Sequence, residues 1–504
     1  MPEKKKYDIV IIGSGLGGLF CGALLASQGK RVCVLEKHGQ PGGNLQTFKR
    51  KGCSFSAGMH YGGSLDKGQV LYKIFNYFGI YKSLNFKKLD EDCFDKIIIG
   101  DKEYCYAMGM DNFRNTLLKY FPDERKAIDK YVDKLTEIWN SSDLINLREV
   151  NFNRPPDFEK YRENAYNFID SLTDNEDLKA VLAGTNGLYA GNKEKTTLYL
   201  HANINTFFIN SAWRIASEGE QLTGSLIKII TGSGGDVLTG KEAVKFTFKD
   251  DIIHSVKVIS GEEYTGENFI SAIHPVLTFR MLGKGKLRKV YVDRINNLEN
   301  SVSAFVLFVV LKKNRIRHIN SNIYYSETKN VWDNYNYTEH SWPRGYMMYT
   351  TEDKQNKGFA ESMVVISMMK FSDVEKWKDT TVMNRGHDYE QFKKGKSRKL
   401  MNLVSVRFPD IAEAVDTVYS ATPLTLRDYT GTVDGSMYGI IKDCNDPLGT
   451  FLSPKTRVPN LFLTGQNIGT HGLLGVIMTA FQTCASFIDI NKLIREIRDY
   501  EEEI

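Results

Sequence analysis

Four residues near the amino terminus have the types and spacing of a nucleotide-binding site. Gly13, Gly15 and Gly18 form a G-x-G-x-x-G pattern, and Glu36 follows at the separation expected of a ribose-binding acid. The first glycine allows a tight turn, the second lets the backbone approach a pyrophosphate, and the third lets a helix pack closely on a strand. We therefore predict that the chain binds a dinucleotide.

The surrounding sequence contains the elements that must position these residues. Residues 7–13 (YDIVIIG) predict a buried strand, residues 19–30 (LFCGALLASQGK) a helix, and residues 31–36 (RVCVLE) a second strand that ends on Glu36. The amino terminus of this helix would face the phosphates with its unpaired N–H groups. A signal peptide shares the basic start and the apolar run, but the ordered glycines and acid favour the nucleotide site.

A second glycine-rich turn lies near the carboxy terminus, in LTGQNIGTHGLLGVIMTAF (residues 463–481). Here an apolar strand leads into glycines, a histidine and an apolar helix. A tight polar elbow between two apolar elements makes sense if a ligand is bound against it. The helix is shorter than the roughly 20 residues of a membrane span, and Gln482 and Thr483 lie within it, so we expect it to be buried in protein.

Several further motifs resemble those of one group of flavoproteins. A second glycine pair, Gly42 and Gly43, follows the ribose acid, and residues 55–65 (FSAGMHYGGSL) contain a G-x-H-Y-x-G run. Residues 422–439 (TPLTLRDYTGTVDGSMYG) precede the elbow, which has TGQ where many relatives have an acid after the glycine. Together the motifs resemble the phytoene desaturase, carotenoid isomerase and retinol saturase-like family of FAD-dependent oxidoreductases, and the TGQ resembles its retinol saturase-like members.

The resemblance implies one FAD, bound without a covalent link by both ends of the chain. Gly465 and Gln466 would approach the ribityl phosphate, and Val244 would contact the adenine. The helix that begins near Gly472 would direct its amino terminus at the flavin, where negative charge develops on reduction. The full set of implied cofactor-binding residues is Gly13, Gly15, Leu16, Gly17, Gly18, Glu36, Lys37, Gly42, Gly43, Asn44, Val244, Gly465, Gln466, Gly472 and Leu474.

His60, in the GMHYGG run, is the side chain most expected to assist the chemistry. The resemblance implies that this run lies near the flavin, and an imidazole with a pKa near 6.5 could give or accept a proton. The alternative is a histidine that only hydrogen-bonds the loop around Gly58 and Gly62. Besides His60, only His471 is expected close enough to the flavin for covalent attachment, which the family generally lacks.

The expected fold class is α/β, with a Rossmann-type FAD-binding domain like that of amine oxidases and phytoene desaturases. Residues 1–85, 215–285 and 420–504 would form this discontinuous domain, and residues 86–214 and 286–419 a substrate domain of mixed sheet and helical cap. Helical periodicity from Asp111 to about Asn140, and from about Pro156 to Gly184, predicts the cap. No second nucleotide fingerprint is expected, because GSGGD (residues 232–236) is followed by a strand hairpin.

Composition excludes several classes of protein. The formal net charge is +5, from 66 basic and 61 acidic residues, so nothing favours nucleic acid as a partner. The 7 cysteines occur singly and in odd number, which predicts neither disulfides nor a metal site and favours the cytoplasm, with peripheral contact at a membrane left open. The basic run of residues 392–404 predicts an amphipathic helix with its lysines in solvent.

The leading interpretation is an FAD-dependent enzyme that acts on C–C bonds of a long apolar substrate, an isoprenoid or polyene. Saturation, desaturation and isomerisation stay open, and so does the external electron donor or acceptor, whether nicotinamide, quinone or oxygen. Two alternatives are a flavin amine oxidase and a prenyl-binding escort protein that uses no flavin. A complete glycine fingerprint with Glu36 favours the flavoenzymes over the escort protein.

Overall fold

A computed structural model describes residues 6–152, 157–215 and 219–500. Its first large sheet contains the predicted nucleotide-binding strands. The strands, in spatial order, are β10 (Asp236–Leu238), β2 (Val32–Leu35), β1 (Lys6–Ile12), β13 (Glu263–Ser271), β12 (Ile252–Val258) and β11 (Ala243–Lys249), with β19 (Leu461–Leu463) also beside β13. The β10, β2, β1, β13 and β19 strands pair in parallel, whereas β11 and β12 form the antiparallel hairpin predicted after GSGGD.

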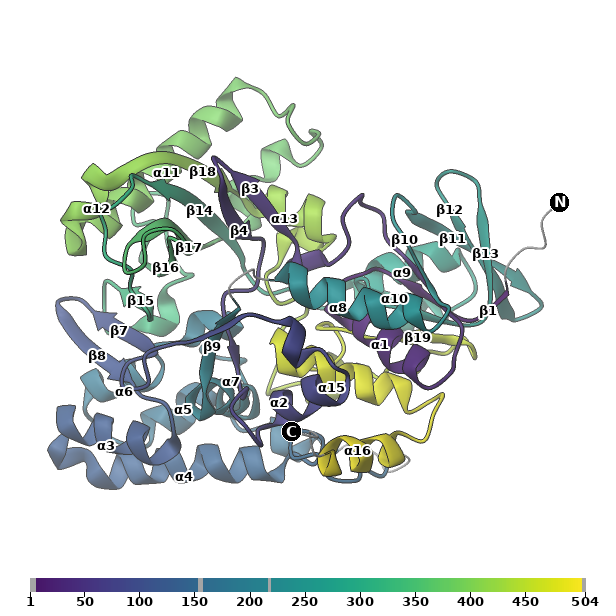
Figure 1. The fold of residues 1–504 in the computed structure, drawn as a ribbon, viewed down its shortest axis with the longest axis horizontal. Helices are drawn as coiled ribbons and strands as arrows, with labels where there is room; N and C mark the ends of the chain where they lie inside the picture. Colours follow the sequence, from purple (N-terminus) through teal and green to yellow (C-terminus); the bar gives the residue numbers. More distant parts are fainter. Residues whose placement is uncertain (1–5, 153–156, 216–218, 501–504) are drawn as a thin grey trace.

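Helices cover both faces of this first sheet. On one face α1 (Leu16–Ser27) packs against α8 (Gly219–Gly232) and α15 (Gly472–Cys484), and their apolar side chains share one core. On the other face α9 (Pro275–Leu282) and α10 (Lys289–Asn296) pack near β11 and α9 contributes to a second core. Figure 1 shows the sheet at the end of the molecule nearest the amino terminus, with α15 and α16 (Ile490–Asp499) below it. The β2 strand is buried throughout because layers lie on both of its sides.

A second large sheet occupies the other end of the molecule (Figure 1). Its order is β18 (Val415–Ala421), β14 (Ser303–Leu311), β17 (Ala360–Met369), β16 (Gly345–Glu352), β15 (Asn322–Ser326), β7 (Asp95–Ile99) and β8 (Lys102–Tyr106). All of its pairs are antiparallel except β15 with β7. The β14 strand is buried along its whole length, because its side chains enter separate cores on the two faces.

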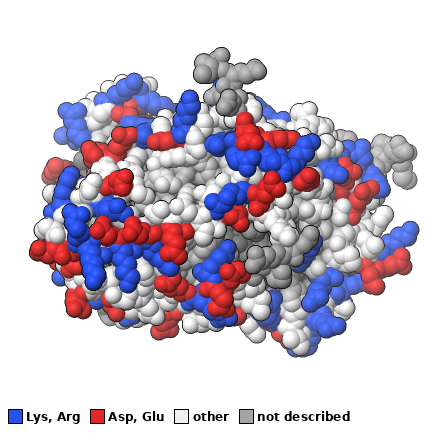
Figure 2. All heavy atoms as spheres, turned by 90° about the horizontal axis from the view of Figure 1, so that it is seen from below, with Lys and Arg blue, Asp and Glu red and all other residues white. Residues whose placement is uncertain are grey.

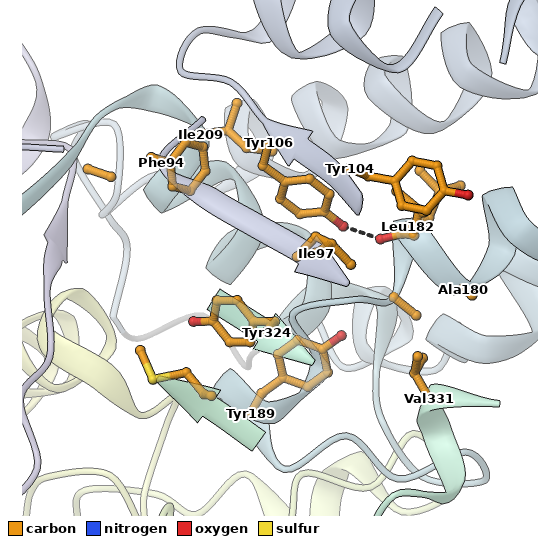
Figure 3. Packing of buried hydrophobic residues seen from close by; sticks show 14 of the residues in the cluster. Phe94, Ile97, Tyr104, Tyr106, Ala180, Leu182, Tyr189, Ile209, Tyr324 and Val331 are labelled. Atoms are coloured by element: carbon orange, nitrogen blue, oxygen red, sulfur yellow. Dashed lines mark hydrogen bonds between the residues drawn. The ribbon is translucent and has the colours of Figure 1, made fainter. Parts of the chain in front are cut away.

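Helices also cover the second sheet. The elements α11 (His387–Arg407) and α12 (Pro409–Ala414) share the core of one face. The helices of the other face are α3 (Met110–Tyr120), α4 (Arg125–Ser141), α5 (Ala165–Asp170), α6 (Glu176–Leu182) and α7 (Leu198–Asn210). Figure 3 shows this apolar packing around Ile97 and Tyr106 of the β7–β8 hairpin. The helical regions predicted from Asp111 to about Asn140 and from about Pro156 to Gly184 are therefore confirmed as α3 to α6, although Pro122 divides the first and Pro156 itself lies outside the described residues.

Smaller elements connect the two sheets. They are β3 (Thr47–Arg50) with β4 (Cys53–Ser56), the three-stranded β5 (Gly62–Gly63), β9 (Ala212–Ile215) and β6 (Phe86–Lys88), and the helices α2 (Val70–Tyr77), α13 (Pro423–Thr430) and α14 (Pro447–Thr450). The α/β fold class is confirmed. The division of the chain into an FAD-binding and a substrate domain stays a prediction.

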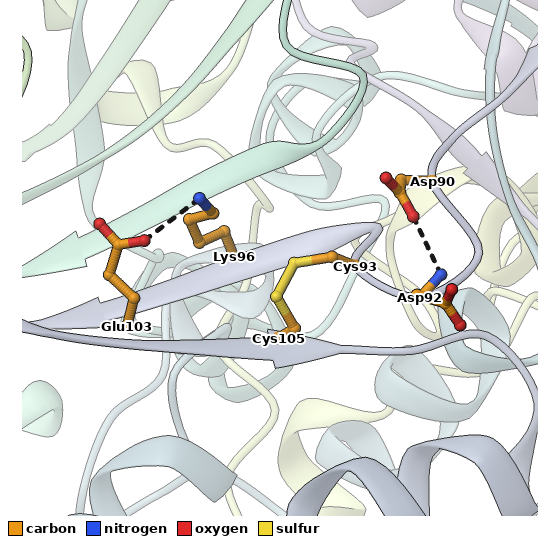
Figure 4. Close-up of a disulfide and its surroundings, with 6 residues drawn as sticks. All are labelled: Asp90, Asp92, Cys93, Lys96, Glu103 and Cys105. Carbon is orange, nitrogen blue, oxygen red and sulfur yellow. Dashed lines mark hydrogen bonds and ion pairs between the residues drawn. A yellow bond between two sulfur atoms is a disulfide. The ribbon is translucent and has the colours of Figure 1, made fainter. Parts of the chain in front are cut away.

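The expectation that no cysteines pair is wrong. Cys93 and Cys105 form a disulfide with a Cα–Cα distance of 4.8 Å. Cys93 precedes β7 and Cys105 lies in β8, and the register that pairs Lys96 with Cys105 brings the two cysteines together (Figure 4). Their separation of 12 residues is the length of a hairpin and not a motif spacing, so inspection for paired motifs missed it. The five other cysteines are buried and do not form disulfides.

The helix predicted from the basic run is present as α11, but one lysine does not behave as predicted. Lys396 is buried, and its Nζ lies 4.7 Å from the centre of the Trp342 ring. Burial lowers its pKa below the ordinary value. The lysine therefore packs into the core through its aliphatic stem and an aromatic face and does not extend into solvent.

The surface carries mixed charge. Figure 2 shows lysines and arginines interspersed with acidic residues over the face seen from below in Figure 1. Within the described ranges, no helix is both long and apolar enough to cross a membrane.

Candidate functional site

A cavity of about 2090 Å³ lies where the two large sheets meet. Its wall contains Gly13, Gly15 and Gly17, residues 58–61 of the GMHYGG run, the elbow after β19 and residues of the second sheet, whereas Gly18 lies behind the wall. The cavity therefore brings together segments from both ends of the chain, as the sequence predicts. Ligand sites of drug-sized molecules typically measure roughly 300–1,000 Å³, so this cavity has room for a dinucleotide and a second ligand together.

Steric contacts explain why the positions of the amino-terminal fingerprint are glycines. Gly13 has φ +95°, and a Cβ on it would lie 2.9 Å from Cγ2 of Ile273. A Cβ on Gly18 would collide with the carbonyl oxygen of Gly13, so α1 packs on β1 at a distance that only glycine permits. A Cβ on Gly15, by contrast, would meet nothing within 4 Å. The backbone at Gly15 is therefore exposed to open cavity, as a pyrophosphate site requires.

Glu36 lies at the end of β2 and organises the loops around it. Its Oε2 accepts hydrogen bonds from the backbone N and the hydroxyl of Ser14, and its Oε1 accepts one from the backbone N of His38 at 2.8 Å. The side chain is buried yet lines the cavity. A carboxylate has about four lone-pair positions, so it can hold these loops and still accept a bond from a ribose.

Glu36→Ala is expected to weaken dinucleotide binding by about 1.5–3 kcal/mol, the value typical of charge-assisted hydrogen bonds. Isothermal titration of the apoprotein measures the change. Ser14→Ala is the matched control, because it removes the loop contact and leaves the carboxylate in place. Equal losses in the two variants would show that Glu36 acts only on the loop.

The second glycine pair lies across the start of α1. The backbone N of Gly42 donates to the carbonyl oxygen and the hydroxyl of Ser14, both at 3.1 Å. A Cβ on Gly43 would lie 3.1 Å from Cα of Gly15. Asn44 follows in the same wall of the cavity. The pair thus lets a second backbone segment approach the place where Gly15 would meet a phosphate.

The elbow after β19 forms the opposite wall. The backbone N of Thr464 donates to the Ser271 carbonyl at 3.0 Å, which extends the pairing of β19 with β13. Gly465 then turns with φ +93°, and its Cα lies 3.0 Å from the position of a Cβ on Gly17. The helix α15 begins at Gly472, as predicted, and no side chain caps it. Its free N–H groups and those of α1 both border the cavity.

The remaining predicted residues also line the cavity. They are Leu16, Gly17, Lys37, Val244, Gln466 and Leu474. Val244 lies in β11 and is 41% exposed, which is consistent with a side chain that touches a ligand and not a core. Lys37 is held at the rim, where its Nζ donates to the Asp428 carbonyl at 3.2 Å. Their roles toward a cofactor stay predictions.

A buried lysine that the sequence did not point to supports the elbow. Nζ of Lys442 donates to the carbonyls of Thr450 and Asn467, both at 2.9 Å, and to Ile468 at 3.4 Å. Burial lowers its pKa to about 7. Because two of these carbonyls belong to the elbow, Lys442 holds the backbone of the elbow in place through hydrogen bonds.

His60 lines the cavity, but its surroundings do not give it the ordinary imidazole pKa that the sequence analysis expects. Burial, together with the charge of Arg214, lowers its pKa to about 4, so the imidazole is neutral at pH 7. Its ring lies 5.5 Å from the Tyr349 ring, and Arg214 donates to its backbone carbonyl at 3.0 Å. The expectation of an ordinary pKa near 6.5 is therefore wrong, which weakens the argument for His60 as a proton donor.

His471, at the start of α15, is also neutral. Burial lowers its pKa to about 4, and its Nε2 donates to the Leu188 carbonyl at 3.0 Å. Its ring stacks on Tyr438 with the centroids 4.2 Å apart. These contacts orient the histidine as part of the cavity wall.

A polar cluster beside His60 was missed at the sequence level. The hydroxyl of Tyr61 lies 3.0 Å from Oδ2 of Asp95 and 3.0 Å from the hydroxyl of Tyr324. Both tyrosines line the cavity, whereas Asp95 lies behind them and is 1% exposed. Tyr61 was visible in the GMHYGG run, but Asp95 looks like an ordinary acid before an apolar strand. Only the pairing of β7 with β15 brings it beside Tyr324.

The far part of the cavity is an apolar chamber. Its wall is formed by Ile204, Phe207 and Phe208 of α7 and by Ala304, Val306, Met347, Val364, Ile366 and Met368 of the second sheet. The chamber continues from the elbow without a separating wall, because residues of both regions line the same cavity. A ligand in the chamber would therefore meet a dinucleotide end-on in a dry environment.

The residues present fit a flavin dinucleotide. Gly15 leaves open space for a pyrophosphate, and two uncapped helix termini supply unpaired N–H groups and positive dipole ends for anionic groups. Glu36 is placed to accept from a ribose. These features all border one cavity, as binding of an extended two-part cofactor requires.

Comparisons with known proteins agree with this geometry. Residues 11–78 match the NAD(P)-binding Rossmann-like domain family. The all-trans-retinol 13,14-reductase of Danio rerio is 27% identical over 97% of this chain and 86% of its own length. Prolycopene isomerase 2 of an Oncidium hybrid cultivar is 30% identical, over 30% of this chain and 26% of its own length.

These matches support a relationship to the retinol saturase-like and carotenoid isomerase-like proteins. Among solved structures, cyclohexylamine oxidase from Brevibacterium oxydans has a TM-score of 0.60 and 13% identity, over 97% of this chain and 100% of that one. At this identity the likeness concerns the fold alone.

Proposed function

We propose that this protein is an FAD-dependent oxidoreductase that acts on C–C bonds of a long apolar substrate, an isoprenoid or polyene. The observation that carries the proposal is the single cavity that joins a dinucleotide site to an apolar chamber. The names of the retinol reductase and prolycopene isomerase relatives support substrates of this class. Saturation, desaturation and isomerisation all use the same arrangement.

FAD would lie between the amino-terminal glycines and the elbow. When bound, the flavin supplies two-electron redox chemistry. Gly13, Gly15 and Gly43 would admit the pyrophosphate, and Glu36 would hold a ribose. The uncapped start of α15 carries roughly half a positive elementary charge. This charge would stabilise negative charge on the isoalloxazine.

The chain's other residues orient the substrate and exclude water. The apolar chamber would bury a polyene tail, which contributes about 25 cal/mol for each Å² of apolar surface removed from water. The rings of Phe207 and Phe208, 4.9 Å apart, narrow the chamber beside Tyr61. A dry site also strengthens every electrostatic contact around the reacting atoms.

The cofactor is expected to leave the denatured protein. Of the two histidines considered for covalent attachment, His471 binds the Leu188 carbonyl and the ring of His60 lies against Tyr349. Acid or heat denaturation followed by filtration should recover all of the flavin in the filtrate. Flavin that stays with the polypeptide would contradict the non-covalent proposal.

Electrons would enter or leave through an external partner at the rim. Arg280, Arg294 and Arg457 come from three separate segments, are exposed and line the same cavity. Guanidinium groups suit the phosphates of a nicotinamide donor, and this feature supports nicotinamide over quinone or oxygen. A cytoplasmic location with peripheral membrane contact stays a prediction.

Two alternatives are separated by one experiment. The purified protein is reduced by light under anaerobic conditions, and polyenes and enones are screened for reoxidation of the flavin, while amines are tested for reduction of the oxidised flavin. Reoxidation by a polyene or enone supports the proposal. Reduction of the oxidised flavin by amines alone would favour an amine oxidase, and a colourless protein that binds prenyl groups would favour an escort protein.

A further inference from the structure

We propose that Tyr324 is the residue that exchanges a proton with the substrate carbon, and that Tyr61 and Asp95 connect it to a buried proton reservoir. This inference rests on the proposed function. The three groups form a continuous chain from the cavity wall into the protein, with both O–O contacts at 3.0 Å. We call this chain the tyrosine–aspartate relay.

Tyr324 is the end of the relay that meets the cavity. It lies in β15, its ring lines the cavity, and its hydroxyl contacts that of Tyr61. Figure 3 shows this hydroxyl pointing away from the apolar side chains around Ile97 and Tyr106. The neighbouring Tyr438 also lines the cavity, but its hydroxyl donates to the Gly187 carbonyl at 3.1 Å. Of these two hydroxyls, that of Tyr324 is therefore the one available to a ligand.

Tyr61 is held rigidly in the middle of the relay. Its ring stacks on Phe208 with the centroids 4.0 Å apart, and Phe208 forms part of the apolar chamber. The relay thus reaches the cavity where the chamber meets the GMHYGG run. A substrate tail in the chamber would place its carbons beside these two hydroxyls.

Asp95 has the surroundings of a proton reservoir and not of an ion pair. Its Oδ1 accepts from the Asn322 amide at 2.8 Å, and the Arg214 guanidinium donates to the oxygen of that same amide at 2.8 Å. Asn322 therefore stands between the carboxyl and the cation. Tyr106 is the further titratable group near Asp95, and its hydroxyl bonds the Val181 carbonyl. Burial raises the pKa of Asp95 to about 7, so both protonation states are populated near neutral pH.

In the direction of reduction, the substrate double bond receives a proton from Tyr324 and two electrons with the second hydrogen from the reduced flavin. The O–H bond of Tyr324 breaks, and a C–H bond forms at one carbon of the substrate double bond with the π electron pair. The adjacent carbon receives two electrons and the second hydrogen from the reduced flavin. The substrate is reduced, the flavin is oxidised, and the Tyr324 oxygen regains a proton from Tyr61, which takes one from Asp95. Solvent then reprotonates Asp95.

The test compares Tyr324→Phe with Tyr337→Phe in flavin-loaded protein. Tyr337 is a matched control because it too is a buried tyrosine with a hydrogen-bonded hydroxyl, which donates to Asp373 at 2.9 Å, but it does not line the cavity. After flavin content is equalised, Tyr324→Phe should slow flavin reoxidation by a polyene or enone by roughly 10²-fold or more. Tyr337→Phe should stay within about twofold of the wild type. Near-normal turnover in Tyr324→Phe overturns the inference.

Asp95→Asn is tested as a positioning variant. It should lower kcat with little change in KM, and it should remove the pH dependence of kcat near pH 7. A readout independent of activity is infrared difference spectroscopy of the apoprotein, in which a carboxyl band titrating near pH 7 should be lost in Asp95→Asn. A carboxyl that titrates near pH 4 would overturn the reservoir.

The outcomes also separate this inference from the proposed function. If polyenes and enones neither reoxidise the reduced wild-type flavin, nor reduce the oxidised one, nor are isomerised by the protein, the proposed function is wrong and the relay falls with it. If they reoxidise the wild-type and the Tyr324→Phe flavin equally fast, the function holds and the relay is wrong.

Discussion

Gly15→Val is expected to leave a folded protein that no longer retains flavin. A Cβ at this position meets nothing within 4 Å, and the residue has φ −63°, so valine fits the backbone without strain. Its side chain would extend into the space where the pyrophosphate must lie. We expect binding weaker by about 100-fold or more, equivalent to ~2.8 kcal/mol, measured by titration of the apoprotein with FAD.

Gly39→Val is the matched control for this substitution. Gly39 also has no neighbour within 4 Å of a Cβ and no positive φ, but it lies outside the cavity. Both variants should show a wild-type unfolding transition without cofactor. Full flavin occupancy in Gly15→Val would contradict the whole placement of the dinucleotide, including the roles given to Gly43 and the elbow.

The second large effect is expected in acid. Burial is the main cause of lowered pKa values in five histidines: to about 4 in His60, His274, His318 and His471, and to about 3 in His201. Between pH 6.5 and 4 these groups take up protons in the unfolded chain but not in the folded one. The free energy of unfolding must therefore fall as the pH falls, by about 1.4 kcal/mol per pH unit for each such proton.

Asp95 acts in the opposite direction. Its pKa is raised to about 7 in the folded protein, so between pH 7 and about 4 the folded state binds the extra proton and gains stability as the pH falls. One such carboxyl offsets at most the loss of unfolding free energy that one buried histidine causes. The net expectation is a marked loss of stability between pH 6.5 and 5, before most carboxylates titrate.

Denaturant unfolding at pH 7, 6 and 5 and constant ionic strength measures this loss. His201→Gln should reduce the slope of the unfolding free energy against pH by the contribution of about one proton. Glutamine can still bond Tyr131 and Tyr189 but does not titrate. His254→Gln is the control, since His254 is exposed. Equal stability at pH 7 and pH 5 would show that the buried histidines are not neutral.

The parts of the site built from local sequence could be predicted. The glycines of the fingerprint act through their own backbone and through neighbours in one βαβ unit, so spacing alone identifies them. The start of α15 at Gly472 could be predicted in the same way. The helix α7 could not, because it is buried on nearly all sides, polar residues included, and its sequence carries no amphipathic period.

The relay could not be predicted because it depends on long-range register. Asp95 pairs with Asn322 across β7 and β15, more than two hundred positions apart in the chain, and Tyr324 follows two residues later. The Cys93–Cys105 disulfide and the burial of Lys396 likewise depend on which strand or ring lies opposite. Sequence pattern gives the type of each element, whereas partners across a sheet become visible only once the sheet is assembled.

The assembly of the cavity from both ends of the chain has a consequence for biosynthesis. The thiol of Cys21, in α1, contacts the hydroxyl of Thr464 at 3.4 Å across 443 positions, and β13 lacks its neighbour β19 until that region exists. At about 5–20 residues per second, a ribosome needs roughly 20–90 s to make the intervening chain. During this time the glycine fingerprint has no opposite wall, and the apolar face of α1 has no α15 to cover it. A ligand that binds only the completed site cannot stabilise the nascent chain, so that face stays without its α15 cover until α15 has left the ribosome.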